Sequence, residues 1–261
     1  MNPRRISFLV AAALFVATAA SAAVKTREIE YTQGETKLHG LIAWDDAIKG
    51  KRPGVLVVHE WWGMNDYAGH QAERLAQAGY VGFALDMYGD GKVTTHPQDA
   101  ETFAAEATKD PAVVAARFSA ARAALVADPH VDARHIGAIG FCFGGGVVLG
   151  MARSGADLGA VASFHGMLAT DHPAEPGKIK AAILVMTGAD DPFVPPDQVA
   201  KFESEMKAAG ANFKVIRYPG AKHSFTNPDA ASYGMPQLAY NADAAKKSWA
   251  AMLSMFGKHL K

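Results

Sequence analysis

The sequence lacks several features that would assign it to a particular class of protein. With one cysteine in 261 residues, it cannot form a disulfide within the chain. Its 26 Lys and Arg residues balance 26 Asp and Glu residues, and no dense basic tract suggests nucleic acid or anionic lipid as a partner. It has no internal repeat and no low-complexity tract. We therefore expect a small, neutral or weakly charged ligand and no nucleic acid.

The N-terminal segment has the three parts of a secretory signal. Arg4 and Arg5 form a basic start, residues 6–20 form an apolar run, and residues 20–23 (ASAA) resemble a cleavage site. The apolar run is shorter than the roughly 20 residues of a transmembrane helix. We predict a signal peptide at residues 1–22, a periplasmic or secreted mature protein, and no stable membrane association after cleavage. A retained anchor stays open, as does the choice between Sec and twin-arginine export.

Residues 23–261 have the length of one α/β domain. Apolar strand-like runs alternate with helical ones, which is typical of a mostly parallel sheet covered by helices on both faces. The predicted strands are residues 27–31, 37–44, 55–58, 80–85, 135–139, 160–164, 182–186 and 213–218. The predicted helices are residues 67–78, 111–127, 145–152, 196–209 and about 238–260. Residues 89–99 and 170–177 are predicted as irregular loops.

The most informative motif surrounds the single cysteine. Cys142 lies in Gly-Phe-Cys-Phe-Gly-Gly, between a predicted strand and a predicted helix. Glycines that flank a nucleophile let the strand turn sharply into the helix and expose the side chain, as in the nucleophile elbow of α/β-hydrolases. The helix N-terminus favours a thiolate, and the amide of Phe143 can donate to an oxyanion. The motif therefore predicts that Cys142 is a nucleophile.

Two other interpretations of this motif are a structural core cysteine and a dinucleotide-binding loop. A cysteine that only fills core volume, the usual place of a free cysteine, has no need of flanking glycines. A dinucleotide-binding loop closes the first strand–helix unit and needs an acidic residue after the next strand. Here the glycines lie in mid-chain, and the next strand ends in Phe-His-Gly at residues 164–166. Both interpretations fit the residues less well than the elbow.

The partners of the nucleophile follow from chain order. In α/β-hydrolases an acid and then a histidine follow the nucleophile, each after a strand. Asp191 follows the strand at residues 182–186, and His223 alone among ten histidines lies between the last predicted strand and the last helix. His223 would act as the base, and Asp191 would orient its ring. Asp190 stays open as the acid, with Asp191 then capping a turn before Pro192.

A third segment, His-Glu-Trp-Trp-Gly at residues 59–63, follows the first buried strand. It resembles the start of the zinc motif HExxH, but position 63 is glycine and the segment leaves a strand, so we predict no metal. The amide of Trp61 is the expected second oxyanion donor. Glu60 is expected to accept a hydrogen bond from the thiol or to handle a proton. Trp61 and Trp62 are expected to wall the pocket or pack in the core.

With these segments assembled, the chain from about residue 24 to 261 resembles the dienelactone hydrolase family. The matching residues are Glu60 in HEWWGMN, Asp86-Met87-Tyr88, Cys142 in GFCFGG, Asp191, and His223-Ser224-Phe225. The resemblance implies an α/β-hydrolase fold with about eight strands. It also implies that a covalent acyl-enzyme forms on Cys142 during hydrolysis of an ester or of a lactone such as a dienelactone. By the same resemblance, Glu60 would hold the thiol at rest until substrate arrives.

Two positions depart from the family pattern. Where the resemblance implies arginines that bind a substrate carboxylate, this chain has Asp90 and Asn227. Lys92 or Lys222 could substitute, but a lysine is a point charge and cannot copy the bidentate arginine fork. The substrate therefore stays open, although its chemistry is predicted.

Trp62, Tyr88 and Phe225 are the residues that we expect to bind substrate, and no cofactor is expected. Two functions of other classes are a non-catalytic binding protein and a thiol-based redox protein. A non-catalytic binding protein with the same fold would have no need of an intact triad. A redox protein that uses Cys142 alone would lack a resolving cysteine.

Overall fold

The computed structural model describes residues 24–261, and the predicted signal peptide lies outside the described residues. Its centre is an eight-stranded sheet with the strand order β1-β2-β4-β3-β5-β6-β7-β8. The β1–β2 and β2–β4 pairs are antiparallel, and all other neighbouring pairs are parallel. The strands are β1 (Val24–Gln33), β2 (Thr36–Asp45), β3 (Arg52–Val58), β4 (Val81–Leu85), β5 (Val131–Phe141), β6 (Ala160–Phe164), β7 (Ala182–Gly188) and β8 (Phe213–Tyr218).

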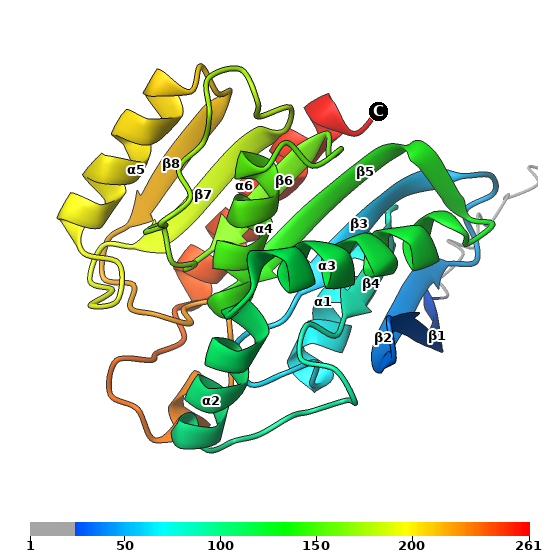
Figure 1. The fold of residues 1–261 in the computed structure, drawn as a ribbon, viewed down its shortest axis with the longest axis horizontal. Coiled ribbons are helices and arrows are strands. Elements are labelled where there is room, and N and C mark those ends of the chain that lie inside the picture. The colour runs from blue at the N-terminus through cyan, green and yellow to red at the C-terminus, as the bar shows by residue number, and fades with distance from the viewer. Residues whose placement is uncertain (1–23) are drawn as a thin grey trace, which may run out of the picture.

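Helices cover both faces of this sheet, as Figure 1 shows. Side chains of α1 and α6 pack in one core layer, and those of α3, α4 and α5 pack in the other. The helices are α1 (Asp66–Gln77), α2 (Pro97–Thr108), α3 (Pro111–Val126), α4 (Phe143–Arg153), α5 (Pro196–Ala208) and α6 (Ala242–His259), with a short 3-10 helix η1 (Ala230–Tyr233). The predicted α/β class, with a mostly parallel sheet of eight strands, is confirmed.

The apolar composition of the central strands follows from their position. Every residue of β4, β6 and β7 is buried, because helices cover the sheet on both sides. The parallel strands direct their carboxyl ends toward the same edge of the sheet. The loops after β3, β5, β7 and β8 therefore meet there. These loops carry the predicted site residues Glu60, Cys142, Asp191 and His223.

The structure has a helix, α2, at residues 97–108, where the sequence predicts an irregular loop as far as residue 99 and no element after it. This prediction is wrong. Only Ala100 and Ala107 of this helix are buried, so it has no continuous apolar stripe that would indicate a helix. Helix α6 begins at Ala242 and not at residue 238, because the Asn241 side chain accepts a hydrogen bond from the Ala244 N–H (3.1 Å) and caps it. Strand β5 begins at Val131, four residues before the predicted start.

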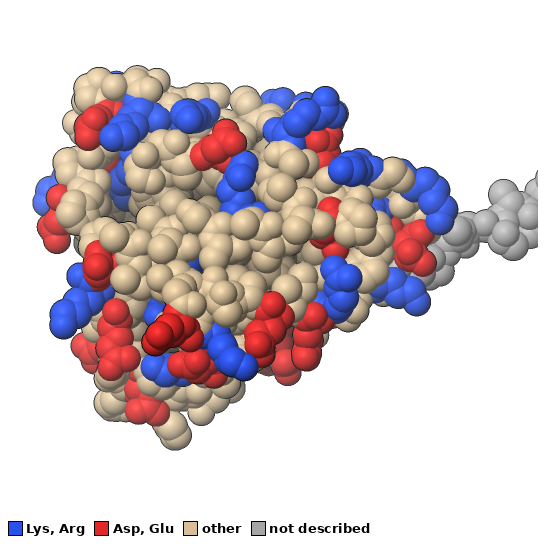
Figure 2. Space-filling view, turned by 45° about the vertical axis from the view of Figure 1, so that its right-hand side comes forward, with Lys and Arg blue, Asp and Glu red and all other residues tan. Residues whose placement is uncertain are grey.

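The described residues present no strong patch of one charge on the face drawn in Figure 2, where acidic and basic side chains alternate around an uncharged expanse. None of the helices described within residues 24–261 is both long and apolar enough to cross a membrane.

Candidate active site

The turn between β5 and α4 has the geometry of a nucleophile elbow. Cys142 stands immediately before α4 with a positive φ of 52°, a conformation that side-chain-bearing residues rarely adopt. A Cβ at Gly140 would overlap the Gly144 carbonyl, and one at Gly144 would overlap the Val58 carbonyl. The glycines around the cysteine are therefore required by close backbone contacts, and the Cys142 side chain stays partly exposed.

His223 and Asp191 form a buried pair at the same edge of the sheet. His223 Nδ1 lies 2.8 Å from Asp191 Oδ2, and the two residues are 3 % and 4 % exposed. The other Asp191 oxygen accepts a hydrogen bond from the Phe193 N–H (2.9 Å), which fixes the carboxylate plane. Asp190, the alternative acid, is exposed and has no contact with His223 among its hydrogen bonds. The structure thus brings Asp191 to the histidine.

The charge state of His223 depends on both partners. Burial lowers the pKa of His223, but the charge of the neighbouring Cys142 thiolate and the hydrogen bonds to Asp191 and Cys142 outweigh burial and raise the pKa to about 10. The ring is also enclosed by Phe193, whose centroid lies 5.0 Å away at 88°. This environment favours the protonated ring of His223 at neutral pH.

Two backbone amides beside the cysteine are available for an oxyanion. Within residues 24–261, neither the Trp61 N–H nor the Phe143 N–H forms a backbone hydrogen bond. The two chain segments are joined directly, because the Gly144 N–H donates to the His59 carbonyl (3.1 Å). Tyr88 Oη donates to the Trp61 carbonyl (2.9 Å), which belongs to the next peptide, and so holds the chain immediately after the Trp61 N–H. The arrangement can stabilise negative charge that develops on a carbonyl oxygen.

The loop after β4 holds Tyr88 in place. Asp86 is fully buried, and one of its oxygens accepts hydrogen bonds from the N–H groups of Tyr88 (2.7 Å) and Gly89 (2.8 Å). Arg117 donates to the carbonyls of Met87 (2.6 Å) and Tyr88 (3.0 Å) from the other side. Tyr88 is 4 % exposed, and burial raises the pKa of its phenol well above the usual range. Its hydroxyl therefore supports Trp61 as a neutral donor.

Glu60 is buried beside this site, but its partners differ from those expected. Ser224 Oγ donates to one carboxylate oxygen (2.8 Å), and Asn227 Nδ2 donates to the other (2.7 Å). Burial raises the pKa of Glu60, while the two donors and the charge of His223 act in the opposite direction. The expected hydrogen bond with the Cys142 thiol is not among its contacts. Asn227, at a position where the resemblance implies an arginine, is used to hold Glu60.

All three expected substrate-binding side chains are buried, Tyr88 at 4 % exposure and the other two completely. Trp62 is 0 % exposed and stacks on Tyr233 with a centroid distance of 3.9 Å and an angle of 4°. Phe225 is also 0 % exposed and packs against the rings of His165 and Tyr218. Because neither residue offers surface to a ligand in this conformation, both support the site from within.

A second buried histidine, His165, lies under the elbow and was not predicted from the sequence. His165 has a φ of 40°, and its Nδ1 accepts a hydrogen bond from the Cys142 N–H (3.1 Å). Its Nε2 lies 2.8 Å from Thr226 Oγ1, which in turn is 2.7 Å from Tyr67 Oη. Burial and the charge of His223 hold the pKa of His165 well below its usual value, so the ring is neutral. Its position directly after β6 was the signal that could have found it.

Neither lysine that could replace the implied arginines is free. Lys92 pairs with Glu106 (3.9 Å), and Lys222 donates to the Pro236 carbonyl (3.0 Å). Asp90 is exposed and adds negative charge. Within residues 24–261 there is also no cluster of three or more His, Cys, Asp or Glu side chains that could hold a metal ion.

Comparisons with known proteins agree with this geometry. The model of the dienelactone hydrolase family matches residues 38–260. A Synechocystis protein provisionally named carboxymethylenebutenolidase is 30 % identical over 259 residues, covering 91 % of this chain and 98 % of the relative. A Bradyrhizobium protein named as a probable 2-oxo-3-(5-oxofuran-2-ylidene)propanoate lactonase is 29 % identical over 238 residues, covering 88 % and 92 %.

A solved structure gives the same result. The crystal structure of a dienelactone hydrolase-like promiscuous phosphotriesterase from metagenomic libraries is 38 % identical, with a TM-score of 0.86 over 92 % of this chain and 100 % of that one. The family model covers far more than half of the chain. The chain therefore belongs to the dienelactone hydrolase family, a family of hydrolases that act on lactones and esters.

Proposed function

We propose that the chain hydrolyses uncharged carboxylic esters or lactones with Cys142 as nucleophile, His223 as base and Asp191 as the residue that orients the base. The observation that carries the proposal is the buried 2.8 Å contact between His223 Nδ1 and Asp191 Oδ2 beside a cysteine held at a φ of 52°. A cysteine at an elbow, a histidine oriented by a buried carboxylate and two amides without a backbone partner are the parts of an acyl-transfer site.

The reaction would proceed through a thioester. The Cys142 thiolate attacks the carbonyl carbon, and the amides of Trp61 and Phe143 stabilise the oxygen that becomes negative. Collapse of this intermediate breaks the carbon–oxygen bond, and His223 gives its proton to the departing alcohol oxygen. Water then attacks the thioester while His223 takes its proton. The products are a carboxylic acid and an alcohol, and the thiolate and imidazolium are regenerated.

The preference for an uncharged substrate follows from the cations near the site. Lys92 and Lys222 are engaged with other partners, and Asn227 donates to Glu60. A substrate carboxylate would thus gain no guanidinium partner there and would lie near the acid Glu60. A dienelactone, whose carboxylate is charged at neutral pH, is expected to be a poorer substrate than a neutral ester.

Hydrolysis of p-nitrophenyl acetate and of a dienelactone by reduced, purified protein tests the proposal. The wild type should release p-nitrophenol, Cys142→Ala should not, and mass spectrometry should detect an acyl group on Cys142 during turnover. Activity that survives in Cys142→Ala would refute the nucleophile. Absence of turnover with fresh wild type would favour a binding protein, and peroxide turnover would favour a redox protein.

A second candidate activity is hydrolysis of neutral phosphotriesters. A relative that is 38 % identical over its full length is described as a promiscuous phosphotriesterase. A thiolate beside oxyanion donors can attack phosphorus as well as a carbonyl carbon, and a triester carries no charge that the site must balance. Release of p-nitrophenol from paraoxon, and its loss in Cys142→Ala, would support this activity.

We also propose export to the periplasm or beyond, which rests on the pattern of residues 1–23 alone. Fractionation of cells that express the whole chain tests it, since an exported protein should begin at Ala23 after cleavage. Full-length chain in the cytoplasm would refute it.

A further inference from the structure

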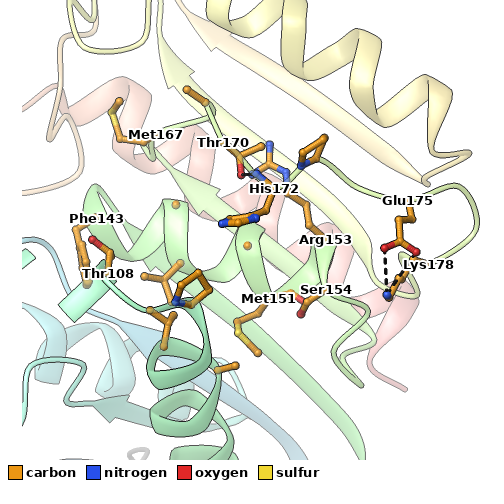
Figure 3. Close-up of a pocket in the computed structure, with 18 residues that line it drawn as sticks. Thr108, Phe143, Met151, Arg153, Ser154, Met167, Thr170, His172, Glu175 and Lys178 are labelled. Carbon is orange, nitrogen blue, oxygen red and sulfur yellow. Dashed lines mark hydrogen bonds and ion pairs between the residues drawn. The ribbon is translucent and has the colours of Figure 1, made fainter. Parts of the chain in front are cut away.

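A groove of about 650 Å³ runs along the outer face of α4, next to the nucleophile (Figure 3). We call it the α4 groove. Its walls are α4, the turn from α2 to α3, and the loop between β6 and β7. The lining begins at Phe143, the residue after Cys142, and its far end lies at Glu175 and Lys178. The groove therefore begins one residue after Cys142, which does not itself line it.

The floor of the α4 groove consists of small and apolar residues. Gly146 and Gly150 face it from successive turns of α4, with Val147 and Met151 beside them. A Cβ at Gly150 would meet no atom within 4 Å, so the groove is open at that point. Val114 of α3 contributes to the opposite wall. These residues present apolar surface along a continuous path.

Two exposed apolar side chains lie near this end of the α4 groove and near His223. Met167 is 42 % exposed, and its Cβ would lie 3.7 Å from a Cβ at Gly146, so it borders the entrance. A methionine side chain is flexible and adapts to apolar groups of different shape. Phe193, 36 % exposed and packed against His223, adds apolar surface near the base.

The arginine and the lysine in the lining, Arg153 and Lys178, each form an ion pair with a glutamate. Arg153 binds Glu205 through two nitrogens (2.8 and 2.9 Å), and Lys178 pairs with Glu175 (3.5 Å). The lining thus offers no unpaired lysine or arginine to a carboxylate, and an uncharged chain suits it better than an anion.

We propose that the α4 groove binds the acyl chain of the substrate, so that the protein favours esters of medium-length fatty acids over acetates. This inference rests on the function proposed above. The acyl carbon becomes bonded to Cys142 Sγ at the N-terminus of α4. The leaving alcohol must lie within reach of His223, and neither His223 nor Asp191 lines the groove. The acyl side of the substrate is therefore the side that extends along α4.

The length of the chain that reaches the middle of the groove follows from helix geometry. Gly150 lies about 12 Å beyond Cys142 along the α4 axis, at roughly 1.5 Å per residue. An acetyl group cannot extend that far, whereas a decanoyl chain can. A bulky side chain at position 150 should therefore affect long acyl groups and not short ones.

The experiment compares p-nitrophenyl acetate, butyrate, octanoate and decanoate for wild type, Gly150→Phe and Gly257→Phe. Gly257 lies in α6, where a Cβ would meet only the Lys261 Cε at 4.0 Å, so it is a matched helical control. We expect kcat/KM of the wild type to rise with chain length. Gly150→Phe should lower the decanoate-to-acetate ratio of kcat/KM about tenfold, as the loss of two buried methylene contacts would. Gly257→Phe should keep the wild-type ratio.

The outcomes separate this inference from the proposed function. If the wild type cleaves all four esters with equal kcat/KM, or if Gly150→Phe changes the ratio no more than Gly257→Phe does, the acyl-chain assignment is refuted and the hydrolase assignment stands. If the wild type cleaves none of them, the proposed function fails, and the acyl-chain assignment fails with it.

Discussion

Replacement of Asp191 by asparagine removes the charge that lies 2.8 Å from His223 Nδ1 and changes the shape of the side chain very little. The two residues are 4 % and 3 % exposed, so solvent does not screen their interaction. A hydrogen bond to a charged group contributes about 1.5–3 kcal/mol. If that stabilisation is lost from the imidazolium, kcat/KM should fall about 10- to 150-fold.

Two assays measure this change. Hydrolysis of p-nitrophenyl acetate gives kcat/KM, and the rate of Cys142 alkylation by iodoacetamide at neutral pH reports how readily the thiolate–imidazolium pair forms. Both should fall in Asp191→Asn, because the imidazolium partner of the thiolate is less stable. Asp190→Asn is the matched control, since Asp190 is the exposed neighbour and should leave both rates unchanged.

The reverse pattern would refute the reasoning. If Asp190→Asn loses activity and Asp191→Asn does not, Asp190 is the acid in solution. If neither change affects alkylation or hydrolysis, the charge of the acid does not support His223 at all. Thermal unfolding of each variant shows whether a lost rate reflects a lost fold.

Three further substitutions test the groups around the triad. Asn227→Leu leaves one oxygen of buried Glu60 without its donor, and should cost about 1.5–3 kcal/mol in urea unfolding. Because the pKa of Glu60 is already raised in the folded state, its favourable contribution is present at low pH and lost as pH rises through that pKa. The loss in Asn227→Leu should thus be larger at about pH 8 than at about pH 5; an equal loss would argue against a buried charge. His165→Leu removes one of the two acceptors of the Cys142 N–H and leaves the Phe164 carbonyl as the other, and should lower kcat up to about tenfold with little change in KM, whereas His165→Gln should restore part of the rate. Tyr88→Phe removes the donor to the Trp61 carbonyl and should likewise lower kcat about tenfold. Unchanged kcat in His165→Leu would show that the Cys142 amide is held without His165. Unchanged kcat in Tyr88→Phe would show that the segment around the Trp61 amide is held without the Tyr88 hydroxyl.

The elbow at Cys142 and the place of His223 could be predicted because local rules determine them. A strand that turns directly into a helix needs glycine where Gly140 and Gly144 stand, and chain order identifies His223. The sequence favours Asp191 over Asp190 but leaves Asp190 open, since both follow β7 within three residues. Burial decides it, as the backbone turns the Asp191 side chain inward and leaves Asp190 exposed. Which of the two aspartate side chains faces inward depends on the conformation of the whole loop after β7.

The contacts of Glu60 could not be predicted, because its two partners lie 164 and 167 residues away in the chain. Both partners belong to the loop after β8, which also carries His223. Ser224, next to His223, has a φ of 52°, a conformation that costs about 1–3 kcal/mol for a residue other than glycine. That strained backbone directs its hydroxyl to Glu60 while His223 faces Asp191. One loop therefore positions the base and the buried acid together, so a shift of this loop would disturb both at once.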